Sequence, residues 1–479
     1  MKKLLNKWRA LPEATKSSLA FMLSSFFLTG LSVLTTPIFT RLIDSSQYGI
    51  VATYNSWRSI IDVFALLGLT SAGVFNVGLN EHKDSRDQYI SSILALCNIV
   101  TVVVFGVIFT LKYFLGDEFF LPYNLILLMF IHLIFNPANV FWITRQKYEY
   151  KYKLSTLITI LSSISAQALS LIVVILSATS NNLGSVRLWS VEIASLLFCV
   201  PIYFYIMLKG KKPFSARIWK KTLIFALPLI PHYLAQHVMS SADTIMLKEL
   251  VGESAAGIYS VVHTVGKIAT IVWSAINVSL IAITFEALNT KDYKSLSRLV
   301  ASLVFGYGII CLVITLIAPE VLMILAPDEY SAGVYVVPPI ACVSFLCALY
   351  NIYANIEFYH KRPFYIALST IVATVVNLVL NAILIPHLSY IGAAYTTFIS
   401  YIVLIFMHYF GYKKSANGEK IYNNKLLLLI SVAIIGTCLL SNLLYVNRIV
   451  RYVIIGVMLV VAIIKHKAIK EKLTMLFKK

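Results

Sequence analysis

Residues 364–385, FYIALSTIVATVVNLVLNAILI, contain no charged side chain over 22 consecutive positions. A helix of this length spans the hydrocarbon core of a bilayer, which is about 30 Å thick. In lipid the backbone must satisfy its own hydrogen bonds, so such a segment is expected to be helical. The stretch therefore predicts a transmembrane helix.

Similar apolar stretches recur along the whole chain, and we predict about fourteen spans in an all-α, polytopic membrane protein. The expected bounds are 17–40, 49–79, 89–114, 123–143, 154–178, 186–208, 222–247, 255–285, 296–317, 334–357, 364–385, 391–412, 426–445 and 449–464. The loop 318–334 is itself half apolar, and we expect a short helix there. Spans two and eight exceed what a bilayer requires and are expected to tilt or project.

The composition excludes a soluble globular protein. Of 479 residues, 59% are hydrophobic and only 13% are charged, whereas a soluble domain has roughly a quarter of its residues charged. All six cysteines lie in apolar spans without metal-type spacing, so neither a disulfide nor a metal site is expected. We find no phosphate-binding loop, and we expect no cofactor.

The net charge of +19 could suggest nucleic-acid binding, but the positions of the charges favour another explanation. If the N-terminus is cytoplasmic, most Lys and Arg residues fall in cytoplasmic loops and in the C-terminal tail. Asp117, Glu118 and Glu320 then fall outside. This is the pattern of the positive-inside rule, so we predict that both termini are cytoplasmic and expect no nucleic-acid partner.

The two halves of the sequence match weakly at an offset of 207 to 208 residues. Near residue 40 and near residue 247, an apolar span reaches a basic residue and a polar loop, then Gly-Ile opens a long helix. We therefore predict a duplication, with six-helix lobes at 1–210 and 211–412 around a central cavity. A helix pair with a basic tail occupies 413–479. Repeats of six spans are typical of alternating-access carriers.

Short motifs resemble those of a known transporter family. They are Arg41-Leu42, QYGI at 47–50, SADTIML at 241–247, AGIYS at 256–260 and the loop beginning APE at 318–320. Together they resemble polysaccharide-type (O-antigen or capsule repeat-unit, Wzx-like) flippases of the multidrug/oligosaccharidyl-lipid/polysaccharide (MOP) superfamily.

The resemblance implies a flippase rather than an enzyme. It would move a polyprenyl-pyrophosphate-linked oligosaccharide across the bacterial cytoplasmic membrane for surface polysaccharide synthesis, beside membrane lipids and other polysaccharide-assembly membrane proteins. The alternatives are a peptidoglycan-precursor flippase, a cation-coupled drug exporter and a membrane polysaccharide polymerase or ligase. The last would carry a large outside loop with catalytic residues, and none is present in the sequence.

Charged side chains at bilayer depth are costly and usually face the protein interior or water. In span two, Asn55, Arg58 and Asp62 form one stripe at helical spacing. In span eight, Lys267 lies at nearly the same distance from Gly-Ile as Arg58 does in span two. We predict that both cations line the cavity and bind an anionic, pyrophosphate-bearing cargo.

Polar side chains on three further sets of positions, in spans one, seven and eight, would complete the cavity lining. The candidates are Ser25 and Thr29 in span one, His232 and Gln236 in span seven, and Tyr259, His263, Thr270 and Asn277 in span eight.

Several of these polar residues have a purely structural alternative. Arg58 could neutralise Asp62 at i,i+4 as a packing pair. Asp243 is a candidate for ion coupling, or it could pair with Lys248. We expect Glu192 to be structural.

Overall fold

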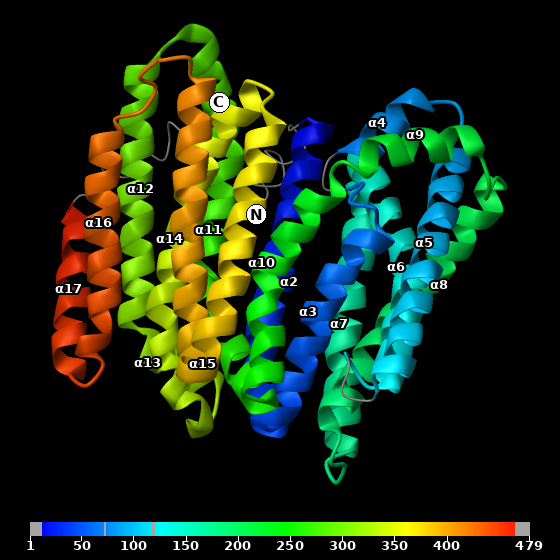
Figure 1. Cartoon of the computed structure of the whole chain (residues 1–479), viewed down its shortest axis with the longest axis horizontal. Coiled ribbons are helices and arrows are strands. Elements are labelled where there is room, and N and C mark those ends of the chain that lie inside the picture. The colour runs from blue at the N-terminus through cyan, green and yellow to red at the C-terminus, as the bar shows by residue number, and fades with distance from the viewer. Residues whose placement is uncertain (1–11, 71–72, 117–119, 465–479) are drawn as a thin grey trace, which may run out of the picture. The chain divides into compact units, whose positions relative to one another are not determined.

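The computed structural model describes residues 12–70, 73–116 and 120–464, and these residues are almost entirely helical (Figure 1). The first half contains α2 (Glu13–Leu42), α3 (Ser45–Ala65), α4 (Val74–Glu81), α5 (Arg86–Leu115), α6 (Tyr123–Tyr148), α7 (Tyr152–Leu176), α8 (Leu183–Gly210) and α9 (Ala216–Ala226). The second contains α10 (Ile230–Leu250), α11 (Glu253–Thr290), α12 (Tyr293–Leu316), α13 (Ala318–Leu325), η1 (Asp328–Val336), α14 (Val337–Tyr359), α15 (Pro363–Ser415), α16 (Asn424–Leu440), η2 (Ser441–Leu444) and α17 (Arg448–Ile464). The N-terminal lysines, Asp117, Glu118 and the basic C-terminal tail lie outside the described residues.

The all-α, polytopic prediction is confirmed. Among the described residues, ten helices are long and apolar enough to cross a membrane, and α9 with α10 makes an eleventh candidate bent by 56°. The fourteen predicted spans all coincide with helices, although not one to one. Spans eleven and twelve form the single helix α15, which is kinked at Ser389, three residues after Pro386. Spans two and fourteen correspond to α3 and α17, and that these two cross the bilayer stays a prediction.

The long helix predicted for residues 49–79 is wrong, because α3 ends at Ala65. Leu67 and Gly68 have φ values of +51° and +61°. The Gly68 N–H donates to Val63 O and the Leu67 N–H to Phe64 O, each at 3.1 Å. These two bonds form the Schellman motif that ends many helices. The chain then starts the separate helix α4.

Contacts divide the chain into two compact units, Met1–Ser241 and Ala242–Lys479. In unit 1, α7 packs against α8 and α2, α6 packs against α8, and α3 contacts α5, α6 and α8. In unit 2, α14 packs against α11 and α15, and α12 packs against α16. The predicted division at residues 210 and 412, and the cavity between the lobes, stay predictions.

The fourth predicted helix of each half ends in the same way, which agrees with a duplication. Two residues after the end of α6, Tyr150 has φ +56°, and two residues after the end of α14, Lys361 has φ +53°. The next residue in each case, Lys151 or Arg362, donates its N–H to the carbonyl oxygen five residues earlier. These are again Schellman bonds. The two helix ends are 211 positions apart, close to the sequence offset.

The predicted short helix in the loop 318–334 is confirmed as α13, and it holds the C-terminal helix α17. Arg451 of α17 donates to both Glu320 carboxylate oxygens, at 2.7 and 2.8 Å, and to Leu316 O at 2.7 Å. Tyr452 adds a hydrogen bond to Glu320 at 2.9 Å. A bidentate guanidinium–carboxylate pair is among the strongest polar contacts in proteins.

Candidate functional site

Helix α3 supplies the polar stripe of unit 1. The Asp44 side chain caps its first turn by accepting from the Gln47 N–H at 2.8 Å. Carboxylates at this position satisfy free backbone donors. The buried face of α3 includes Tyr54, Ile61 and Ala65, and Arg58 and Asp62 line a pocket on the same helix.

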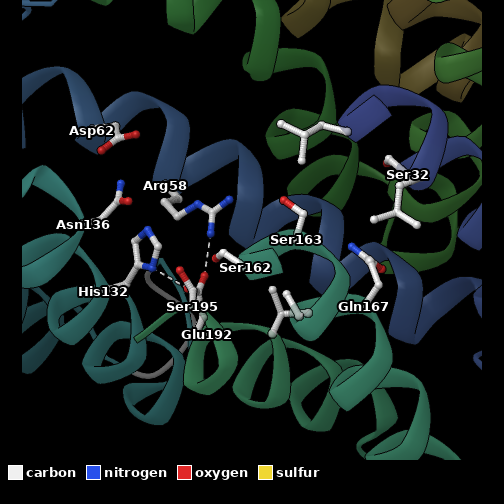
Figure 2. A pocket seen from close by; sticks show the side chains of 14 residues that line it. Ser32, Arg58, Asp62, His132, Asn136, Ser162, Ser163, Gln167, Glu192 and Ser195 are labelled. Atoms are coloured by element: carbon white, nitrogen blue, oxygen red, sulfur yellow. Dashed lines mark hydrogen bonds and ion pairs between the residues drawn. The ribbon is translucent and has the colours of Figure 1, made fainter. Parts of the chain in front are cut away.

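The pocket in unit 1 has a volume of about 340 Å³. Side chains from α2, α3, α6, α7 and α8 line it, and Figure 2 shows them converging on one space. The polar residues of the lining are Ser32, Arg58, Asp62, His132, Asn136, Ser162, Ser163, Gln167, Glu192 and Ser195. This lining offers many hydroxyl and amide groups beside a few charges, as sites for polar ligands do.

Arg58 pairs with Glu192 of α8, with its Nη1 2.5 Å from Oε1 (Figure 2). The Arg58 side chain is 30% exposed, whereas that of Glu192 is 1% exposed. The other Glu192 oxygen pairs with His132 Nδ1 of α6. The packing pair between Arg58 and Asp62 is therefore wrong, because the acid that faces the guanidinium comes from another helix.

The charges of the pocket are mixed rather than purely cationic. Arg58 is accompanied by two carboxylates, Asp62 and Glu192, and by His132. Asp62 Oδ1 is buried and accepts no hydrogen bond from the described residues. Any anion that binds Arg58 must therefore compete with Glu192 and approach Asp62.

Other predicted lining residues of unit 1 do not join this pocket. Asn55 and Gln236 are exposed, and neither lines the pocket. Ser25 and Thr29 donate to carbonyls of their own helix, those of Phe21 and Ser25, at 3.0 and 2.9 Å. His232 is half-buried beside Tyr233, with ring centroids 5.3 Å apart. Of the predicted lining residues of unit 1, Arg58 and Asp62 line this pocket, and that the others line a central cavity stays a prediction.

Asp243 of α10 is the centre of a buried polar network in unit 2. It is 3% exposed. Its Oδ2 accepts from Tyr259 at 2.6 Å and Thr397 at 2.5 Å, and its Oδ1 from Asn381 at 2.8 Å and more weakly from Asn377 at 3.4 Å. The alternative partner, Lys248, pairs with Glu249 instead. The pairing of Asp243 with Lys248 is therefore wrong.

The network is rich in oxygen atoms. Asn377 Oδ1 accepts from Asn381 at 3.1 Å, and Asn381 Oδ1 accepts from Thr396. A carboxylate surrounded by amide and hydroxyl oxygens is a suitable environment for a hard cation. Among the described residues, no group of three or more His, Cys, Asp or Glu side chains is placed to hold a metal ion.

Lys267 lies on α11, two turns from Tyr259. His263 stacks on Tyr259 with ring centroids 5.0 Å apart. Lys267 is half-buried and forms no ion pair with a described residue. Thr270 bonds to the Lys267 carbonyl at 2.6 Å, and Asn277 accepts from Asn355 at 3.2 Å. Tyr259 is therefore hydrogen-bonded directly to Asp243, whereas Thr270 bonds within α11 and Asn277 bonds to Asn355 of α14.

Sequence reasoning missed His132 and Gln167, and it gave Glu192 a structural role only, which stays a prediction. All three are polar residues inside predicted spans, which is the signal that could have found them. Two of them even lie on polar stripes, because Asn136 follows His132 and Gln167 follows Ser163 at i,i+4 spacing. Asn377 and Asn381 were also missed, although their i,i+4 spacing places them on one face.

The QYGI motif has a structural role at the start of α3. Gln47 Oε1 accepts from the Gly184 N–H of α8 at 3.1 Å. A Cβ on Gly184 would lie 2.4 Å from the Gln47 backbone oxygen. Arg187, one turn along α8, lies over the rings of Phe39 and Tyr48, 3.9 and 5.0 Å from their centroids. The motif thus joins α2, α3 and α8.

A charge cluster outside the spans joins α5, α6 and α7. Glu149 accepts from Arg145 at 2.9 Å, Arg86 at 3.1 Å and Lys151 at 2.7 Å. Burial opposes ionisation, but the hydrogen bonds from Lys151 and Arg145 outweigh it and lower the pKa of Glu149 to about 2. Asp87 also pairs with Arg145. The cluster fixes the ends of these helices.

Comparison with known proteins gives one family and one fold. Residues 14–286, more than half of the chain, match the family described as "Polysaccharide biosynthesis protein". A search of curated proteins found no match.

Among solved structures, the lipid II flippase MurJ in an inward closed conformation has a TM-score of 0.66 at 13% identity, with 95% of this chain and 99% of MurJ covered. An inward-facing MATE multidrug transporter has a TM-score of 0.57 at 13% identity, covering 81% and 95%. A MOP superfamily transporter from Pyrococcus furiosus has a TM-score of 0.54 at 15% identity, covering 88% and 96%.

These three solved structures are of transporters, and the fold that they share with this chain is a multi-pass helical membrane fold. The chain therefore belongs to the polysaccharide biosynthesis protein family, Wzx-like, with the fold of the MOP transporter superfamily.

Proposed function

We propose that this protein flips a polyprenyl-pyrophosphate-linked oligosaccharide from the inner to the outer leaflet of the bacterial cytoplasmic membrane, with both termini cytoplasmic. Family membership supports a role in polysaccharide synthesis. The observation that carries the proposal is Arg58, a partly exposed guanidinium in a pocket of hydroxyl and amide side chains.

The chemistry of this cargo fits the pocket lining. A guanidinium binds phosphoryl oxygens as a fork, and an ammonium binds them as a point charge. Arg58 would contact the pyrophosphate, and Ser162, Ser163 and Gln167 would contact sugar hydroxyls. We further propose that Lys267 binds the phosphoryl groups during part of an alternating-access cycle. The prenyl chain would remain in lipid throughout.

The decisive test is the position of lipid-linked repeat units after depletion of the protein. They are expected to accumulate on the cytoplasmic leaflet, and wild-type protein restores export. Arg58→Ala and Lys267→Ala are expected to reduce export strongly at normal protein levels. Lys209→Ala, which removes an exposed cation outside the pocket, serves as the control. Full export in both pocket variants would refute the role of the cations.

A second candidate function is export of organic cations, favoured by the two acids of the pocket. The carboxylates of Asp62 and Glu192 could bind a positive charge if Arg58, which now pairs with Glu192, turned away. Transport of a cationic dye into vesicles that lack all lipid-linked sugars distinguishes the two functions. Dye transport that is lost in Asp62→Asn, together with unchanged repeat-unit export, would favour the drug exporter.

We also propose that Asp243 holds the coupling cation, either sodium or a proton. The four donors around its carboxylate, from Tyr259, Asn377, Asn381 and Thr397, keep it ordered without a basic partner among the described residues. Asp243→Asn is expected to abolish the dependence of export on the cation gradient. Thermal stability of the purified protein in sodium against potassium, and at two pH values, identifies the ion. A gradient dependence that survives in Asp243→Asn would exclude the role.

A further inference from the structure

Glu192 connects the one exposed cation of the unit 1 pocket to a buried histidine. Its Oε1 is 2.5 Å from Arg58 Nη1, and its Oε2 pairs with His132 Nδ1. The side chains of Glu192 and His132 are only 1% and 8% exposed, whereas Arg58 is 30% exposed. Of these three side chains, only the arginine is therefore open to a ligand, and Figure 2 shows Glu192 joined to both Arg58 and His132.

A ligand anion at Arg58 changes the charge that Glu192 experiences. The guanidinium must share its positive charge between the ligand and Glu192, or leave Glu192 altogether. A carboxylate that is 1% exposed cannot be compensated by water, and an uncompensated buried charge is costly. His132 is already in contact with this carboxylate, so a proton on its ring would restore the balance.

We propose that the His132–Glu192 pair is a proton site linked to the cargo, so that His132 takes up a proton when an anionic headgroup binds Arg58. This inference rests on the proposed function and adds to it the regulation of the same site. The binding step takes one phosphoryl ligand and up to one proton from solution. The linkage has a fixed sign, because proton uptake on binding makes binding tighter as the pH falls.

Other groups around the pocket could take the proton instead. The titratable and charged groups that face the pair come from α3, α6, α8 and α10, whereas the pocket residues of α2 and α7 are serines, a glutamine and apolar side chains. They are Tyr54, Arg58, Asp62, His132, Glu192, Cys199 and His237. His237 bonds to Ser59 at 2.8 Å rather than to Glu192, and Asp62 Oδ1 has no hydrogen-bond partner among the described residues. His132 is thus best placed.

The test measures proton uptake during binding of a defined probe. The probe is citronellyl-pyrophosphoryl N-acetylglucosamine, a pyrophosphate diester whose charges do not change between about pH 5.5 and 8, where histidine titrates. Calorimetry of the full-length protein in two buffers with different ionisation enthalpies gives the protons bound per ligand. The wild type is expected to take up between zero and one proton per bound ligand near neutral pH. Its apparent Kd is expected to rise by up to about tenfold for each unit by which the pH rises.

His132→Gln is expected to bind the probe without proton uptake and with a Kd that no longer depends on pH. Glu192→Gln removes the competitor for Arg58, so it is expected to bind about fivefold more tightly and also without uptake. Damage to the fold would weaken binding, so tighter binding in this variant would not be explained by such damage. His82→Gln is the matched control, because His82 bonds to Gly78 O outside the pocket, and its uptake should equal that of the wild type.

Undiminished proton uptake in His132→Gln, or its loss in Asp62→Asn or His237→Gln instead, would overturn the assignment to His132. Binding by the wild type without any uptake would overturn the linkage and leave the proposed function standing. Binding that is unaffected by Arg58→Gln, or no binding at all, would overturn the proposed function and this inference with it.

Discussion

The contact between Arg451 and Glu320 gives an asymmetric prediction for the attachment of α17. The Arg451 side chain is 1% exposed and that of Glu320 is 28% exposed. Glu320→Ala leaves a buried guanidinium without its carboxylate, which costs about 3 to 5 kcal/mol. The Leu316 carbonyl still accepts one bond, so we expect about 3 kcal/mol. Arg451→Met leaves a carboxylate that water can reach, and we expect about 1 kcal/mol.

Hydrogen exchange of the α17 amides measures the opening that these changes favour. Since 1.4 kcal/mol is tenfold in an equilibrium constant, Glu320→Ala should accelerate exchange about 100-fold and Arg451→Met about fivefold. The double variant Arg451→Met/Glu320→Leu should return close to the wild type, because it leaves no charge at the contact. Exchange that is faster in Arg451→Met than in Glu320→Ala would refute the assignment of the buried charge.

The same contact predicts a dependence on pH. Burial opposes ionisation of Glu320, but the hydrogen bonds from Arg451 and Tyr452 hold its pKa below the usual range. A lowered carboxylate pKa contributes stability above its unfolded value of 4.5 and loses it as the pH falls through the folded value. Exchange of α17, corrected for the intrinsic exchange rate at each pH, should therefore accelerate in acid in the wild type and not in Glu320→Ala.

Two further changes test the fold of unit 1. Glu149→Gln should destabilise the protein above about pH 4.5 and lose its effect as the pH falls towards about 2, the pKa of this carboxyl; thermal unfolding against pH measures this, and an equal loss at all pH values would contradict it. Gly184→Ala should cost about 1 to 3 kcal/mol because its Cβ meets the Gln47 backbone oxygen at 2.4 Å. Gly106→Ala, with nothing within 4 Å, is the control, and it should leave thermal stability unchanged or slightly raised.

The sequence predicted helices well where apolar length alone determines them. The helix expected at 255–285 is found as α11, Glu253–Thr290. The expectation failed at Leu67, because a leucine in the left-handed region ends α3 where a glycine would have signalled the stop. Helical periodicity predicts which residues lie on the same side of a helix, but it does not predict which residues of other helices contact them.

The candidate site shows the same limit at the level of partners. Spacing placed Arg58 and Asp62 on one stripe, and both line the pocket. The acid that pairs with Arg58 lies 134 residues away, so no local pattern could have identified it. Ser25 satisfies its own helix instead of a cavity, because a hydroxyl in an apolar helix can bond to the carbonyl four residues back.

The two cations at equivalent positions of the repeat, Arg58 and Lys267, have different surroundings, and this difference affects how each binds an anionic cargo. Arg58 is held by a buried carboxylate, whereas Lys267 pairs with no described acid and Asp243 in its unit is bonded to neutral donors. A ligand anion therefore meets a cation in unit 1 that already forms a direct ion pair, and one in unit 2 that forms none with a described residue. Binding at Arg58 requires that Glu192 be compensated by another group, and His132 is the group in contact with it. The affinity for an anion thus depends on the protonation of a residue that the anion does not touch.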